Sequence, residues 1–96
     1  MYRVETTEEF DNWLENVQDG KAQKIIVKRI RTMESGTLGK VRTLSNGLFE
    51  AKIDYGPGYR LYFVNRGQRI IFLLCGGDKS TQKADIKNAG NLAKEI

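Results

Sequence analysis

Side chains that could act on a phosphodiester lie beside two glycine-rich turns of the sequence. Arg60 follows the Gly-Pro-Gly turn at residues 56–58, and a guanidinium offers planar, paired donors to phosphate oxygens. Lys79 lies in the Gly-Gly-Asp-Lys-Ser-Thr segment 76–81, where a turn is expected to enter a helix whose backbone N–H groups favour an anion. Metal-independent RNA cleavage needs such cations, together with a general base and a general acid. Arg60 is therefore predicted as the first catalytic cation and Lys79 as the second.

Glu50 is the carboxylate that the strand pattern places beside Arg60. The expected strands 48–54 and 59–65 pair through the Gly-Pro-Gly turn. The polar residues expected on one surface of this pair are Glu50, Lys52, Arg60 and Tyr62. Glu50 can act there as a catalytic general base, or it can form an ion pair that holds a neighbouring cation. The residue types leave both roles open.

The elements that must position these residues follow from hydrophobic periodicity. Alternating apolar residues predict strands at 2–6, 40–44, 48–54, 59–65 and 68–75, the last apolar on both faces and therefore central. Apolar residues spaced by three and four predict a helix beginning after Thr7 and further helices at 21–34 and 80–94. We therefore predict the α+β class: a small, mostly antiparallel twisted sheet with an N-terminal helical hairpin on one face and a C-terminal helix.

Caps and turns divide these elements. Thr7 is the expected N-cap of the first helix, and Asp19 with the glycine after it is expected to end that helix. Pro57 and Gly58 are expected at the second and third positions of a type II turn. Asp78 is predicted to be a turn or N-cap residue rather than a catalyst. Short connections are predicted at 45–47 and 65–67.

The composition argues against several classes of protein. With 96 residues and 40% hydrophobic content, the chain is predicted to form one domain over residues 1–96. No apolar run approaches the ~18 residues of a membrane span, and the acidic N-terminus is unlike a signal peptide, so a cytoplasmic protein without a membrane segment is expected. Histidine is absent and Cys75 is the single cysteine, so no metal or cofactor is predicted and Cys75 is expected in the core.

The net charge of +4 is unevenly distributed along the chain. Residues 1–20 carry six acidic and one basic side chain, whereas residues 21–96 carry fifteen basic and six acidic ones. A basic body suits a polyanion such as RNA, or an acidic protein that masks it. The basic outer face of the helix predicted at 21–34 is expected either to be solvated or to contact RNA.

Two motifs and three shorter segments resemble a known family. The motifs are Asp-Tyr-Gly-Pro-Gly-Tyr-Arg at 54–60 and Leu-Leu-Cys-Gly-Gly-Asp-Lys-Ser-Thr-Gln at 73–82, followed by Ala-Asp-Ile. The shorter segments are 10–14, 29–30 and 47–50, so the resemblance covers nearly the whole chain. These residues resemble the RelE/HigB superfamily of type II toxin–antitoxin toxins, specifically its phage Gp49-like branch of addiction module killer proteins. The resemblance implies a RelE/ParE-like fold.

The resemblance also implies a function. Such a protein is a toxin that cuts mRNA on the ribosome without a metal ion, inhibits translation, and is neutralised by a cognate antitoxin in a higher-order complex. The antitoxin is expected to be a helix-turn-helix protein. Arg42 and Lys52 fall where the family has basic residues, so together with Lys40 they are expected to hold the RNA backbone. Tyr59 and Tyr62 are expected to stack on RNA bases, although strand propensity alone also accounts for them.

The chain departs from better-known relatives in its acid–base groups. Relatives carry histidine or a tyrosine near the C-terminus, whereas this chain has no histidine and no tyrosine after Tyr62. The general base and acid therefore stay open. Two alternative functions stay open as well: ParE-type toxins share the fold but bind and poison DNA gyrase, and a degenerate toxin would act only as a co-repressor with its antitoxin.

Overall fold

The computed structural model describes residues 1–96 except Asn46 and Gln68. The predictions made for Asn46 in the 45–47 turn and for Gln68 at the start of a strand lie outside the described residues. The described strands are β1 (Arg3–Thr6), β2 (Val41–Ser45), β3 (Leu48–Ile53), β4 (Tyr59–Arg66) and β5 (Ile70–Gly77). The helices are α1 (Glu8–Glu15), α2 (Gly20–Glu34), the 3-10 turn η1 (Lys79–Thr81) and α3 (Gln82–Ala93).

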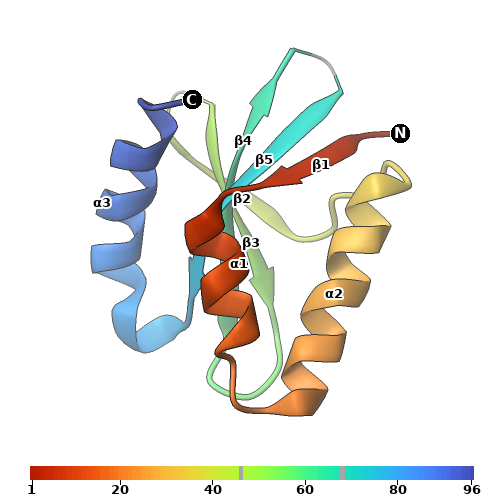
Figure 1. Ribbon diagram of the computed structural model, residues 1–96, viewed down its shortest axis with the longest axis vertical. Helices are drawn as coiled ribbons and strands as arrows, with labels where there is room; N and C mark the ends of the chain where they lie inside the picture. The colour runs from red at the N-terminus through yellow and green to blue at the C-terminus, as the bar shows by residue number, and fades with distance from the viewer. Residues whose placement is uncertain (46, 68) are drawn as a thin grey trace.

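The strands form a sheet in the order β1-β5-β4-β3-β2. β1 pairs with β5 in parallel, and the remaining neighbours are antiparallel. The helical hairpin of α1 and α2 lies on one face of this sheet and α3 lies on the other (Figure 1). The predicted α+β class and the mostly antiparallel sheet are confirmed. β5 lies inside the sheet between β1 and β4, whereas β4 is the central strand.

The first helix is capped as predicted but ends earlier. Thr7 accepts a hydrogen bond from the Phe10 amide at 3.0 Å and donates its hydroxyl to the Leu74 carbonyl at 2.5 Å. Asp19 does not end α1, which is a correction: its carboxylate accepts hydrogen bonds from the Lys21 and Ala22 amides and is the N-cap of α2. A short carboxylate satisfies free N–H groups at a helix start, which explains the difference.

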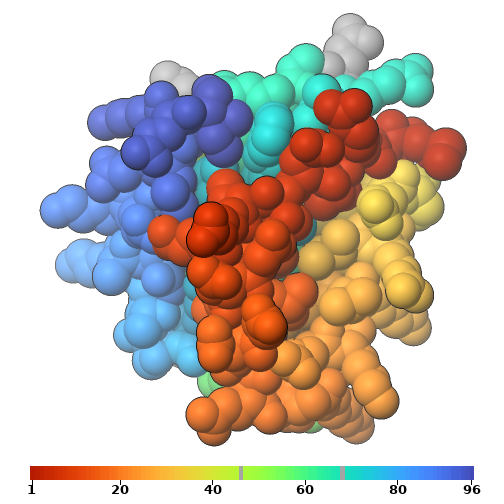
Figure 2. Space-filling view, viewed as in Figure 1, coloured from red at the N-terminus to blue at the C-terminus, as the bar shows by residue number. Residues whose placement is uncertain are grey.

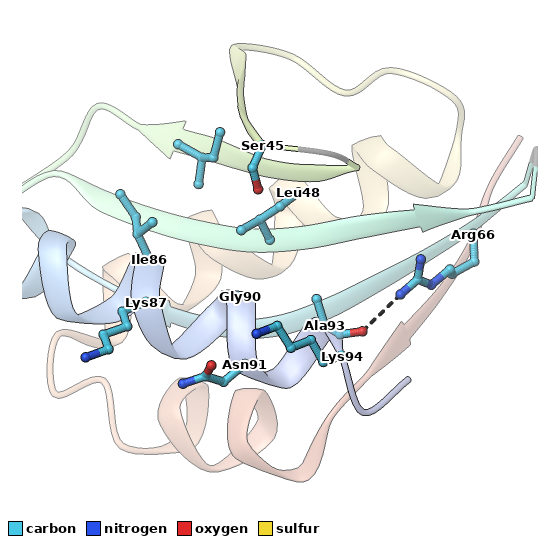
Figure 3. A pocket seen from close by; sticks show the side chains of 10 residues that line it. Ser45, Leu48, Arg66, Ile86, Lys87, Gly90, Asn91, Ala93 and Lys94 are labelled. Carbon is cyan, nitrogen blue, oxygen red and sulfur yellow. Dashed lines mark hydrogen bonds between the residues drawn. The ribbon is translucent and has the colours of Figure 1, made fainter.

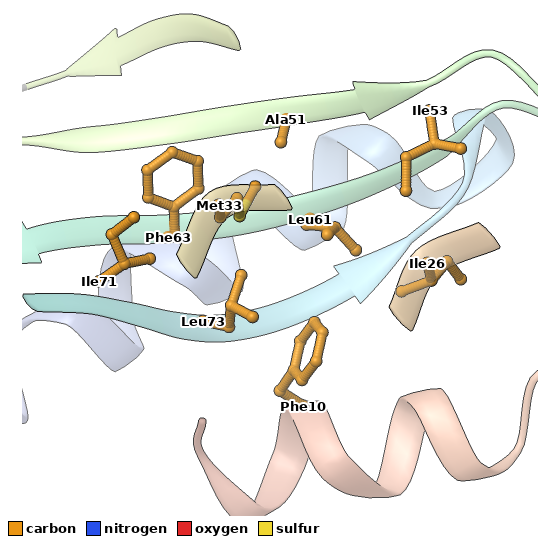
Figure 4. Close-up of a cluster of buried hydrophobic side chains, with 9 residues drawn as sticks. All are labelled: Phe10, Ile26, Met33, Ala51, Ile53, Leu61, Phe63, Ile71 and Leu73. Atoms are coloured by element: carbon orange, nitrogen blue, oxygen red, sulfur yellow. The ribbon is translucent and has the colours of Figure 1, made fainter. Parts of the chain in front are cut away.

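The main core lies between the helical hairpin and the sheet. Figure 4 shows side chains from both helices directed at the strands. Its buried members are Phe10, Ile26, Met33, Ala51, Ile53, Leu61, Phe63, Ile71 and Leu73. The apolar side chains of the two helices therefore pack against the odd-numbered residues of β3 and β4 in one layer, as their periodicities predicted.

A second, smaller core lies under α3. Its buried members are Leu48, Tyr62, Val64, Leu74, Cys75 and Ala89. Between α3 and the β2–β3 edge runs a groove of about 610 Å³, next to which Arg66 donates to the Ala93 carbonyl at 3.0 Å (Figure 3). The sheet is thus covered on both faces where α3 packs on it, whereas the groove beside β2 and the part beyond the start of α3 are open.

The turn between β3 and β4 differs from the expected geometry. The Gly58 amide donates to the Tyr55 carbonyl at 3.1 Å, so Pro57 takes the third position of the turn and Gly56 the second. Gly56 has a φ of 57°, a value that suits glycine and that a type II′ turn requires at this position. Gly58 has the predicted positive φ, at 81°. The rigid reversal that brings β3 and β4 together is preserved.

The buried thiol of Cys75 leads to a prediction about alkaline stability. Cys75 is 2% exposed, and burial raises the pKa of its thiol to about 12. In the unfolded chain the thiol ionises nearer its ordinary pKa of 9.0, so the unfolded state loses this proton at lower pH. The free energy of unfolding should therefore fall between about pH 9 and about pH 12.

Chemical denaturation at about pH 8 and about pH 10.5 checks this prediction. Cys75→Ala should lose less stability than the wild-type protein as the pH rises, because it has no thiol to ionise. Equal losses in the two proteins would assign the alkaline effect to other groups, of which Tyr62 is the first to consider because burial also raises its pKa.

Candidate functional site

Arg60 is held inside the sheet rather than on an open surface. It pairs with Lys52 of β3 and Gly77 of β5, and the residue is 6% exposed. Nη1 donates to the Gly58 carbonyl at 2.7 Å, which ties the guanidinium to the turn that precedes its own strand. Nε lies 3.7 Å from Glu50 Oε2 and has no hydrogen-bond partner among the described residues. The cation is fixed in place while part of its donor capacity stays unused.

Glu50 links three elements at this site. It is 4% exposed, and its Oε2 accepts hydrogen bonds from Gln82 Nε2 at 2.9 Å and from Arg42 Nη2 at 3.3 Å. Glu50 faces Arg42 in the β2–β3 register, and Gln82 is the first residue of α3. The carboxylate therefore joins the edge strand, the centre of the sheet and the start of the last helix.

A pocket of about 340 Å³ brings most of the predicted site residues together. It is lined by Lys40, Val41, Arg42, Glu50, Lys52, Arg60 and Gln82. Glu50 is the single carboxylate among these lining residues. The pocket is thus a cationic recess around one buried acid, a combination suited to holding an anion close to a proton acceptor.

Lys79 belongs to an adjoining pocket of about 350 Å³. This second pocket is lined by Lys52, Asp54, Tyr55, Gly56, Pro57, Gly58, Arg60 and Lys79. Lys52 and Arg60 border both pockets, so the two recesses share a wall of cations. Lys79 is exposed at the start of η1, as expected of a residue free to meet a ligand.

Asp78 is a cap, as predicted. Its carboxylate accepts hydrogen bonds from the Ser80 amide at 2.8 Å and from the Ser80 hydroxyl at 2.5 Å. These bonds hold the pKa of Asp78 below its ordinary value, and the charge of Arg60 acts in the same direction. Asp78 therefore stays ionised and fixes the turn that presents Lys79.

Lys40 and Lys52 share an exposed partner, Asp54. The Lys40 ammonium lies 3.5 Å from Asp54 Oδ2, and the Lys52 ammonium lies 3.4 Å from Asp54 Oδ1. A hydrogen bond from Lys52, followed by the charge of Lys40, holds the pKa of Asp54 below its ordinary value. Surface pairs of this kind contribute little to stability, so both ammonium groups can turn to a phosphate at small cost.

The tyrosines are not arranged as expected. Tyr62 is 0% exposed in the core under α3, so the expectation that it lies on the surface and stacks on a base is wrong. Tyr59 packs edge-on against Trp13 at a centroid distance of 6.4 Å, on the opposite face of the sheet from Arg60. Alternation predicts which residues share a face, but it cannot show that a distant helix covers that face. Tyr55 is half-buried and lines the adjoining pocket that contains Lys79.

Arg29 positions two of the expected RNA-binding residues, a role that the sequence patterns did not reveal. Its guanidinium donates to the Lys52 carbonyl at 2.8 Å, to the Lys40 carbonyl at 2.9 Å and twice to the Leu38 carbonyl at 3.1 and 3.2 Å. Burial lowers the pKa of Arg29 from its ordinary value. At Gly39, which has a φ of 75°, a Cβ atom would lie 2.9 Å from the guanidinium. Arg29 therefore ties the segment before β2 to the end of β3.

Gln82 is the other functional candidate that sequence reasoning missed. It follows the glycine turn in the second motif of the resemblance, and this position was the available signal.

Within residues 1–45, 47–67 and 69–96, no group of three or more His, Cys, Asp or Glu side chains is placed to hold a metal ion. Across the same residues, every helix is too short or too polar to cross a membrane.

Comparisons with known proteins identify the family of this chain. The family described as phage-derived protein Gp49-like (DUF891) matches residues 10–95. A Haemophilus influenzae (strain KW20 / Rd) protein described as uncharacterized is 43% identical over 94 residues, covering 98% of this chain and 95% of that protein.

Solved structures share the fold at low sequence identity. YafQ from E. coli strain BL21(DE3) has a TM-score of 0.59 at 15% identity, covering 85% of this chain and 98% of its own. The conserved hypothetical protein HP0894 from Helicobacter pylori has a TM-score of 0.58 at 17% identity, covering 83% of this chain and 97% of its own. Both similarities concern the fold. The chain therefore belongs to the phage-derived Gp49-like family, as its motifs predicted, and it has the fold of the RelE-like toxins.

Proposed function

We propose that this protein is the toxin of a type II toxin–antitoxin module and that it cuts mRNA on the ribosome without a metal ion. Family membership and the RelE-like fold support the toxin role. The observation that supports cleavage is the placement of Arg60, a buried cation with an unused Nε donor in a pocket bordered by other cations. A fixed guanidinium in a recess is suited to stabilising charge that develops on a phosphorane.

The other cations have positioning roles in this proposal. Lys40, Arg42 and Lys52 line the pocket around Arg60 and bind the phosphates on either side of the cleaved bond. Lys79 binds a phosphate at the adjoining recess, where the backbone of η1 also begins. Cations placed in this way orient the RNA so that its 2′-hydroxyl lies in line with the bond that breaks.

Glu50 is the carboxylate that can take the 2′-hydroxyl proton in this proposal. It lines the pocket and lies beside Arg60, but Arg42 and Gln82 already donate hydrogen bonds to it. Glu50 therefore has two possible contributions: it accepts the proton, or it holds Arg60 in the orientation that phosphate requires. A site with so few acid–base groups suits cleavage on the ribosome, where ribosomal RNA helps position the substrate.

The proposed partner is a cognate antitoxin, expected to be a helix-turn-helix protein that binds the toxin in a higher-order complex. The module would act in the cytoplasm. A basic body with an acidic N-terminal segment suits both an RNA substrate and a protein that masks it.

Mapping of RNA ends after induced expression tests the proposed function. Wild-type protein should halt growth and produce new mRNA ends within translated reading frames, while Arg60→Ala should produce far fewer at equal protein level. Purified protein added to a translating extract should produce the same ends. Intact mRNA with induced DNA breaks would replace this proposal with gyrase poisoning. Intact mRNA and DNA, with repression of its own operon alongside the antitoxin, would replace it with a co-repressor role.

A further inference from the structure

The outward face of α2 carries cations without matching anions. Its exposed basic side chains are Lys21, Lys24, Lys28 and Arg31. Glu34, the last residue, is the one acidic member of the helix, and none of the four cations has an ion pair within the part of the chain that the structure describes. Figure 2 shows this helix, in orange, lying open to solvent along one edge of the molecule.

The spacing of these cations works against the helix itself. Lys24 and Lys28 are four residues apart, and Arg31 follows Lys28 by three, so each has a like charge as its surface neighbour. Like charges at these spacings destabilise an isolated helix. The inward face of α2 already supplies its packing through Ala22, Ile26 and Met33. The outward cations are therefore unexplained by the fold and suit an anionic partner.

At the start of α2, this row of cations meets the recess that adjoins the candidate cleavage site. The Lys21 ammonium lies over the Tyr55 ring at 5.8 Å from its centroid, and Tyr55 lines the recess that holds Arg60 and Lys79. The Tyr55 hydroxyl donates to Asp19 Oδ2 at 3.1 Å, which fixes the ring against the start of α2. Tyr55 therefore joins the helix surface to the pocket.

We propose that the outer face of α2 binds the phosphate backbone of the RNA strand that occupies the Arg60 pocket, with Tyr55 as the link between the two surfaces. This inference rests on the proposed function. Four residues of helix rise about 6 Å, so cations at this spacing form a regular row that suits a repeating polyanion. Contacts of this kind add affinity without sequence preference.

An acidic protein is the less suitable occupant of this face. Val27 is the one apolar side chain among the cations that is exposed, at 36%, and it is surrounded by Lys24, Lys28 and Arg31. The core of a protein interface is more apolar than its rim, and Val27 is the one apolar side chain among the residues that line the groove on this face. A polyanion needs no such apolar core, so the observations favour RNA.

The test compares two single-stranded RNAs of matched composition, one of about six nucleotides that fills only the pocket and one of about sixteen that extends past it. Fluorescence anisotropy at several salt concentrations gives the affinity and its salt dependence for each RNA. The test variant is K24Q/K28Q/R31Q. The matched control is K83Q/K87Q/K94Q, which removes the same charge from exposed lysines of α3 and of the residue after it.

Wild-type protein should bind the longer RNA more tightly and with a steeper salt dependence than the shorter one. The α2 variant should lose this difference, with its slope of log affinity against log salt on the longer RNA reduced by about 2, from three lost phosphate contacts at about 0.7 each. The α3 control should behave like the wild-type protein. Equal losses of affinity for the longer RNA in both variants would show that only the net charge of the protein matters. No loss of affinity in the α2 variant would indicate that this face binds a protein partner instead. Either outcome overturns the inference.

Failure of the proposed function would look different. Arg60→Ala should abolish most cleavage yet keep the affinity difference between long and short RNA, because α2 is intact. If the wild-type protein shows that difference but never cuts RNA in a translating extract, the cleavage proposal fails and the α2 surface stands. If the wild-type protein cuts RNA and the α2 variant still binds the longer RNA more tightly than the shorter one, to the wild-type extent, the cleavage proposal stands and the α2 inference fails.

Discussion

Arg60→Ala is expected to slow RNA cleavage about 10²- to 10³-fold, the effect of removing one preorganised donor from developing charge. Arg60 is the most buried cation of the pocket, and Gly58 and Glu50 fix its guanidinium from two sides. Water cannot replace such a donor without reorganising. Single-turnover cleavage on translating ribosomes, with the protein in excess, measures the loss directly because it is independent of product release.

Arg60→Lys is the matched control for this prediction. It keeps the positive charge but loses the planar fork, so it should recover only part of the lost rate. Because Arg60 is buried beside Glu50, the alanine variant is also expected to lose about 1–3 kcal/mol of stability. Thermal melts must therefore accompany the rates. A large fall in melting temperature with an unchanged rate for the remaining folded protein would make Arg60 a structural residue.

Glu50→Ala is expected to lower the free energy of unfolding by about 3 kcal/mol. The change removes the single carboxylate that lines the pocket and leaves the guanidinium of Arg60 buried, with the Gly58 carbonyl as its hydrogen-bond partner. Arg42, by contrast, is exposed and can turn to solvent, and Gln82 loses one bond. Urea denaturation of the wild-type and variant proteins at neutral pH measures the difference.

A double-mutant cycle measures the interaction free energy between Glu50 and Arg60 apart from their contacts with other residues. If Glu50 and Arg60 stabilise each other, the double alanine variant should be less destabilised than the two single losses predict, by about 0.5–3 kcal/mol. Additive losses would show that the 3.7 Å approach of Arg60 Nε to Glu50 contributes nothing. Cleavage by Glu50→Gln then distinguishes its two roles: a stable variant as slow as Arg60→Ala indicates a general base, and one close to wild type indicates a positioning residue.

The local structure followed from local sequence because its causes lie within a few residues. Apolar residues spaced by three and four predicted α2, and alternation predicted β3 and β4. The Thr7 cap required only a side chain three residues before a free amide. Where two signals competed, the predicted helix boundary was wrong. Asp19 could end the first helix or begin the second, and it begins α2 because its carboxylate accepts hydrogen bonds from two amides there.

The neighbourhood of Glu50 and Arg60 was also predictable, since a tight turn between β3 and β4 leaves little choice of register. The structure pairs Lys52 with Arg60 and Glu50 with Tyr62, as the turn implied. The contribution of Gln82 was not predictable, because its bond to Glu50 joins residues that are 32 positions apart. The same applies to Arg29, whose bond to the Lys52 carbonyl spans 23 positions.

The sequence by itself determined the family, the order and type of the elements, and which side chains share a strand face, because motifs, caps and periodicity are local properties. The tertiary structure alone decided which faces are open. α3 covers one end of the sheet and buries Tyr62, yet it begins just short of Arg60 and leaves the cations around that residue in a recess. That outcome depends on where a helix distant in sequence comes to rest, and packing between distant segments sets this position.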